Sequence, residues 1–172
     1  MKRKFAIILL LSLFLNNVIN AQEKSKKELK AEREQQQKQK IKSLIDAKNF
    51  VFEAQQLTPQ GGRLIQLDYN TYFLKFNTEK TTCDLPFFGR GFNVGYGNDG
   101  GIKFEGKPED IKVSEKKNGW NLKAVVKGKN DVYNLTFSIF ANGKATLTVI
   151  SNNRASISYD GEISAPKTDV NN

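Results

Sequence analysis

Period-two alternation of apolar residues, interrupted by turn residues, runs through most of the chain and constrains its fold more than any other feature. Trp120, Leu122, Ala124 and Val126 alternate with Asn121, Lys123 and Lys127, and only Val125 breaks the pattern. Similar runs follow at residues 133–141, 144–150 and 157–163. Asn118-Gly119 and Asn142-Gly143 separate such runs. Asn-Gly between alternating segments predicts a β-hairpin with a type I′ turn, in which both central residues take positive φ.

Shorter alternating segments precede these hairpins, at residues 50–54, 63–68, 72–76, 81–85, 102–104 and 111–113. Consecutive hairpins form a meander, which must close or stack to protect its edges. We therefore predict a mainly β domain over residues 41–164, an antiparallel meander of roughly eight strands with an N-terminal helix. The pattern leaves a closed barrel and a two-sheet sandwich as alternatives.

The N-terminus has the three parts of a secretory signal peptide. Basic residues 2–4 precede an apolar run of eleven residues, Phe5–Leu15, and the small residue Ala21 follows a polar step. The run is shorter than the roughly 20 residues that span a bilayer. We expect residues 1–21 to be removed, which predicts a periplasmic or secreted protein without a stable membrane span.

Residues 22–40 are almost entirely Glu, Lys, Arg and Gln, which predicts a polar helical or disordered linker. At Ile41, Leu44 and Ile45 the spacing becomes that of one apolar helix face, which can dock on the domain. The tail over residues 165–172 is polar and predicted to be loose.

Charge and composition exclude several classes of function. Residues 22–48 hold nine basic and five acidic residues, and residues 49–172 hold fifteen and thirteen, so the folded part lacks the basic excess of a nucleic-acid-binding protein. There is no histidine and one cysteine, Cys83. These counts exclude disulfides within the chain, Ser-His and Cys-His nucleophile pairs and imidazole metal sites. We expect no metal, no cofactor and a buried, unreactive Cys83.

The stretch 85–104, LPFFGRGFNVGYGNDGGIKF, is the candidate site because six of its residues are Gly and five are Phe or Tyr. We expect the aromatic side chains of Phe87, Phe88, Phe92 and Tyr96 to plug one end of a barrel, with a ligand-gating lid as the alternative. Arg90 and Arg154 each lie near a Tyr and an Asp, and a guanidinium beside aromatic rings can bind a carboxylate, phosphate or sugar. The candidate ligand-binding residues are Arg90, Phe92, Tyr96, Asp99, Arg154 and Tyr159. The same groups can serve the fold, and we expect Arg90 to anchor the loop.

Two classes of function remain. The first is a non-enzymatic binding or envelope-associated module, whose partner is an unknown envelope component or a small ligand. The second is a hydrolase acting on envelope glycans through paired carboxylates such as Asp84, Asp99 and Asp160, which must lie about 5–10 Å apart. No spacing in the sequence pairs these carboxylates, so we expect the first class and predict no catalytic residues. The oligomeric state is left open.

Three blocks occur in order along the chain: Leu85–Arg90, Gly100–Phe104 and Ser151–Gly161. Together they resemble a family of small exported proteins known mainly from Bacteroidota, the domain-of-unknown-function family DUF4251. The resemblance covers about residues 41–164 and implies export and a β-rich domain. It implies no activity.

Overall fold

The computed structural model describes residues 26–92 and 100–167, so the predicted signal peptide lies outside the described residues. The chain divides into two compact units, Met1–Gln37 and Lys38–Asn172. A helix covers residues 26–46, and its side chains are exposed as far as residue 40. Over the described ranges, no helix is both long and apolar enough to cross a lipid bilayer.

The second unit consists mainly of one antiparallel sheet. Its strands are β1 (Phe50–Pro59), β2 (Ile65–Gln66), β3 (Phe73–Phe76), β4 (Thr81–Leu85), β5 (Ile102–Gly106), β6 (Pro108–Lys116), β7 (Gly119–Lys127), β8 (Val132–Phe140), β9 (Lys144–Ser151) and β10 (Ile157–Ser164). The order is β5-β4-β3-β1-β10-β9-β8-β7-β6, and β2 pairs with β1 beside this path. The mainly β fold is confirmed, with ten strands described where roughly eight were predicted.

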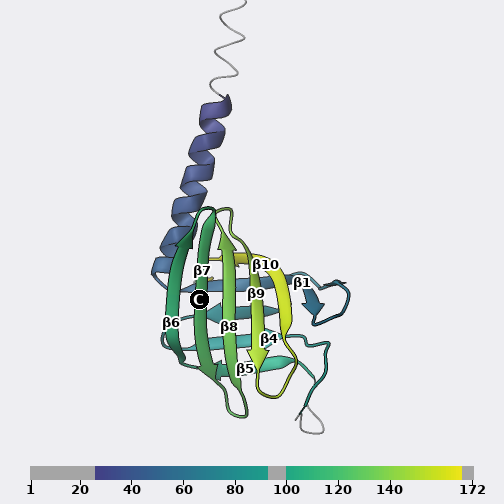
Figure 1. Ribbon diagram of the computed structural model, residues 1–172. Helices are drawn as coiled ribbons and strands as arrows, with labels where there is room; N and C mark the ends of the chain where they lie inside the picture. Colours follow the sequence, from purple (N-terminus) through teal and green to yellow (C-terminus); the bar gives the residue numbers. More distant parts are fainter. Residues whose placement is uncertain (1–25, 93–99, 168–172) are drawn as a thin grey trace, which may run out of the picture. The chain divides into compact units, whose positions relative to one another are not determined.

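The sheet folds back on itself into a nearly closed barrel. Figure 1 shows β6, β7, β8 and β9 side by side in front, with β1, β4 and β5 running across behind them. The two ends of the sheet, β5 and β6, are separated in sequence only by Lys107. The first and last long strands, β1 and β10, pair at the middle of the sheet and join its two halves.

Alternate side chains of these strands fill the interior. Phe50, Phe52, Phe76 and Phe137 pack with ring centroids 5.2–6.2 Å apart. Such aromatic packing adds to the free energy gained by removing apolar area from water. Ile41 and Ile45, four residues apart on the helix, are also part of this core. The predicted docking of the helix is therefore confirmed for its last turns.

Both Asn-Gly hairpins form, but the prediction that their turns are of type I′ is wrong. The described non-glycine residues with positive φ are Lys48, Asn70 and Asp110, so neither asparagine takes that conformation. Gly143 has a φ of 91°, and its amide donates to the Phe140 carbonyl (3.0 Å). The loop between β8 and β9 has three residues, 141–143, and a hairpin loop of this length needs positive φ only at its last residue, Gly143. The hairpin therefore forms without a type I′ turn.

Candidate functional site

Two side chains from the second half of the sheet hold the start of the Gly-rich stretch against the barrel. Leu85 ends β4 in the core, and Pro86 follows it. The Tyr159 hydroxyl, on β10, donates a hydrogen bond to the Pro86 carbonyl (2.6 Å). Burial raises the pKa of the Tyr159 phenol far above its usual value, and the charge of Arg154 opposes that shift only in part. Tyr159, predicted as a ligand contact, is fully buried and supports the loop through this hydrogen bond.

Arg154 holds the loop at three places. The Arg154 backbone forms an isolated antiparallel bridge with the backbone of Gly91. In this bridge the Phe92 amide donates to the Asn153 carbonyl (2.8 Å), and the Ala155 amide donates to the Arg90 carbonyl (3.0 Å). The Arg154 guanidinium donates to the Gly100 carbonyl, at the far end of the stretch. Its Cζ lies 5.1 Å from the centroid of the Phe87 ring. Arg154 thus ties both ends of the stretch to the connection between β9 and β10.

The prediction that the Arg90 side chain anchors the loop is wrong. Arg90 is exposed, and within the described residues its guanidinium has no hydrogen bond or ion pair, whereas Arg154 is half-buried and performs that role. Only the Arg90 backbone carbonyl is held. The bridge at Gly91 pairs the backbone of Arg90 with the connection between β9 and β10, and it is the Arg154 side chain from that connection that reaches the loop carbonyl at Gly100.

The prediction that the aromatic side chains plug the barrel holds for only one of the three described rings. Phe87 packs against the core, beneath Arg154 and beside Gly89. Phe88 is 52% exposed and Phe92 is 68% exposed. Tyr96 and Asp99 lie outside the described residues. The exposed side chains Phe88, Arg90 and Phe92 are separated by single glycines, and we call these three residues the loop tip.

The carboxylates proposed for hydrolysis are not brought together where they are described. Asp84 is on β4 and forms an ion pair with Lys103 (3.4 Å), and Asp160 is on β10 and accepts a hydrogen bond from Thr146 (2.6 Å). Strands β3 and β1 lie between β4 and β10. Three strand spacings amount to about 14 Å, which exceeds the separation that paired carboxylates require.

Metal and thiol chemistry find no support in the described part of the chain. Among residues 26–92 and 100–167, no group of three or more Cys, Asp or Glu side chains is placed to hold a metal ion. Cys83 is 3% exposed, and burial raises the pKa of its thiol well above the usual value. The neutral thiol is a poor nucleophile, so Cys83 serves as a core residue.

A groove of about 560 Å³ on the outer face of the sheet is a feature that the sequence analysis missed. Its lining includes Asn49, Val51, Glu53, Asn70, Phe73 and Lys75, and we call it the outer groove. These residues come from β1, β3 and the segments beside them. The signal that could have found it is the outward-facing half of the alternation in residues 50–54 and 72–76, together with the asparagines at their ends.

These observations define a class of protein: a nearly closed antiparallel β-barrel domain that presents a Gly-rich loop tethered by an arginine. A family model described as "Domain of unknown function (DUF4251)" matches residues 32–163. The chain belongs to this family, which confirms the resemblance of its three sequence blocks.

A solved structure of this family supports the fold. It is the crystal structure at 1.95 Å resolution of a DUF4251 family protein from Bacteroides eggerthii DSM 20697, with a TM-score of 0.59. The two sequences are 24% identical, and the match covers 75% of this chain and 87% of the other. No curated protein matches the chain at a significant level.

Proposed function

We propose that this protein is an exported, non-enzymatic binding module of the bacterial cell envelope, and that the loop tip contacts its ligand. The observation that carries the proposal is the exposure of Phe88 and Phe92 on either side of the exposed Arg90. Large exposed rings are costly in water, and a fold that retains two of them beside an arginine favours a contact surface. Export is inferred from residues 1–21.

The anchoring of the loop supports a binding role for its tip. The bonds from Tyr159 to Pro86 and from Arg154 to Gly100 hold the backbone on both sides of the tip. A contact surface that is already ordered loses less conformational entropy when it binds. Arg154, which anchors the loop, and Arg90, which is exposed at its tip, therefore have separate roles.

The chemistry of the tip favours an anionic glycan of the envelope. An arginine donates paired hydrogen bonds to a carboxylate or phosphate, and aromatic faces pack against the apolar faces of sugar rings. A polymer that carries carboxylates along a sugar chain offers both groups. Purified peptidoglycan has this composition and serves as the probe.

The test is co-sedimentation of the mature protein with purified peptidoglycan. Arg90→Ala and Phe92→Ala should each release most of the bound protein. The matched controls are Arg63→Ala and Tyr69→Ala, because both side chains are exposed in the connection between β1 and β3, on either side of β2. Failure of the unaltered protein to bind, or an equal loss in variants and controls, would contradict the proposal.

A further inference from the structure

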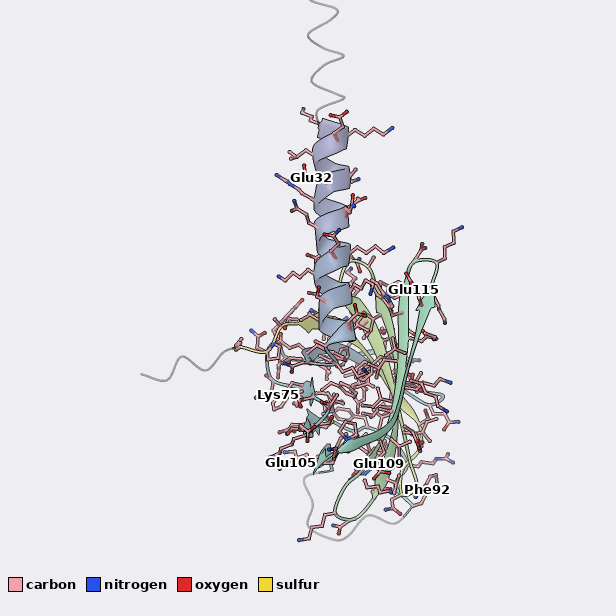
Figure 2. The ribbon with its side chains drawn as sticks, turned by 90° about the vertical axis from the view of Figure 1, so that its left-hand side faces the viewer. Glu32, Lys75, Phe92, Glu105, Glu109 and Glu115 are labelled. Atoms are coloured by element: carbon pink, nitrogen blue, oxygen red, sulfur yellow. The ribbon has the colours of Figure 1, made fainter. Side chains whose placement is uncertain are left out.

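We propose that the outer groove is a second binding site, separate from the loop tip, and that it takes a neutral oligosaccharide. The inference does not depend on the ligand of the loop tip. Figure 2 shows Lys75, which lines the groove, and Phe92, at the tip, on different sides of the domain. The two surfaces can therefore be altered one at a time.

Strand register assembles the floor of the groove. Val51 on β1 lies opposite Lys75 on β3 and Ser164 on β10, and Glu53 lies opposite Phe73 and Glu162. Phe50 and Phe52 point into the core, so Val51 and Glu53 face outward. Although it faces outward, Val51 is only 9% exposed, because the walls of the groove rise around it. The volume of about 560 Å³ lies in the range typical of small-molecule sites.

The groove combines an apolar surface with amide groups. Val51 and the half-buried ring of Phe73 supply the apolar part, and the Lys75 ammonium lies 5.1 Å from the Phe73 ring centroid. Asn49 and Asn70 supply amides from two different segments, and the side chain of Asn49 accepts a hydrogen bond from the amide of Asn77 (3.3 Å). Amides both donate and accept, as sugar hydroxyls do, so the two kinds of group are complementary.

The charges around the groove favour a neutral ligand over an ion. Lys75, Lys80 and Lys167 line it together with Glu53. Lys80 forms an ion pair with Glu105 (2.8 Å), and Glu162 lies opposite Glu53 on β10. The lining itself has three lysines and one glutamate, but Lys80 is held by Glu105, which leaves Lys75 and Lys167 against Glu53 and the neighbouring Glu162, so neither sign is in excess as it is in anion sites.

The position of the groove also disfavours an extended peptide. Peptides commonly bind a sheet by adding a strand to a free edge. Here β3 is already paired with β4 and β1, and β1 with β3 and β10. Recognition must therefore use side chains, which suits a polyhydroxylated ligand.

The experiment is a two-dimensional amide NMR titration of the mature protein with cellotriose, maltotriose and triacetylchitotriose, and with trigalacturonate as an anionic counterpart. At least one neutral trisaccharide should shift the amide resonances of Val51, Phe73, Lys75 and Ser164. The resonances of Phe88, Arg90 and Phe92 should stay in place. No shift in the groove with any neutral sugar, or tighter binding of trigalacturonate there, would overturn the proposal.

Two conservative variants test the residues. Asn70→Asp keeps the side-chain shape but loses the amide donor, and Lys75→Met keeps the packing on Phe73 but loses the N–H donors that can bond sugar hydroxyls. Each should weaken trisaccharide binding about tenfold. The matched controls are Asn118→Asp and Lys123→Met, both at exposed positions of the other half of the sheet. Equal effects of variants and controls would count against the site. Arg90→Ala should leave trisaccharide binding unchanged, which separates a failure here from a failure of the loop-tip proposal.

Discussion

The guanidinium of Arg154 lies 5.1 Å from the centroid of the Phe87 ring while it donates a hydrogen bond to the carbonyl of Gly100. The Arg154 side chain thus covers Phe87, the first aromatic residue of the Gly-rich stretch, and also bonds the backbone at Gly100, near the end of the stretch. Ordering a glycine-rich backbone costs of order 1–2 kcal/mol per residue, and these contacts offset part of that cost. Arg154 is therefore the residue on which the order of the loop depends.

Arg154→Lys should destabilise the protein, whereas Arg90→Lys should not. Lysine keeps the charge but loses the planar group that stacks on Phe87 while bonding Gly100, at an expected cost of about 1–3 kcal/mol. Thermal unfolding should show a melting temperature several degrees lower for Arg154→Lys. Equal melting temperatures for the two variants would mean that Arg154 does not anchor the loop.

Tyr159→Phe should lower the free energy of unfolding at neutral pH. It should also make that free energy fall less steeply as the pH rises above the unfolded-state pKa of tyrosine. The variant leaves the Pro86 carbonyl without its donor, at a cost of about 0.5–1.5 kcal/mol. Burial raises the folded-state pKa of Tyr159, so its contribution is complete below the unfolded-state pKa of about 10 and is lost as pH rises above it.

The measurement is the free energy of unfolding by denaturant between pH 8 and 11, for the unaltered protein, Tyr159→Phe and Tyr69→Phe. Cys83 and Tyr133, whose pKa values are also raised, are present in all three proteins, so their own pH dependence largely cancels in the comparison. The difference between the curves isolates Tyr159. Parallel curves above pH 10 for Tyr159→Phe and the unaltered protein would refute the expected linkage.

Gly161→Ala should be far more damaging than Gly89→Ala. A Cβ at Gly161 would collide with the backbone carbonyl of Glu53, where β1 and β10 pair beside a bulge. Backbone cannot move aside cheaply, so the expected cost is about 3 kcal/mol or more. A Cβ at Gly89 would meet the end of the Phe87 side chain at 2.7 Å, which can shift, so the change should stay within about 1 kcal/mol of zero. Denaturant unfolding of both variants checks the contrast, and similar midpoints would disprove it.

The full-length chain expressed in a Gram-negative host should be recovered from the periplasm with Gln22 as its first residue. The apolar run Phe5–Leu15 and the small residue Ala21 motivate this expectation. Intact mass and N-terminal sequencing of the periplasmic fraction measure it. Recovery of the uncleaved chain from the cytoplasm would reject both the leader and the proposed envelope role.

The strands were predictable because each strand carries its own signal. The alternation of residues 120–126 and 144–150 marks β7 and β9 without knowledge of their neighbours. The extension of β1 to Pro59 was not visible, because its second half is stabilised by pairing with β10 over a hundred residues away. The turn type at Asn142-Gly143 was mispredicted for a similar reason, since loop length depends on strand register.

The site was less predictable than the fold, because its parts are brought together only by register. Arg90 and Arg154 have similar local surroundings in the sequence, yet the bridge between Gly91 and Arg154 buries one side chain and exposes the other. The outer groove depends in the same way on asparagines from separate segments. Local patterns identify residues that can act, and long-range pairing decides which of them do.

The pairing of β1 with β10 has a consequence for the time at which this protein can fold. Strand β10, which joins the two halves of the sheet by pairing with β1, is also the last strand to be synthesised, so β1 lacks this partner until the chain is nearly complete. The other paired strands lie close together in sequence, but this one pairing closes a loop of about a hundred residues, and closing so long a loop slows folding. The two halves of the sheet can therefore join only at the end of synthesis, after each has had time to form its own hairpins.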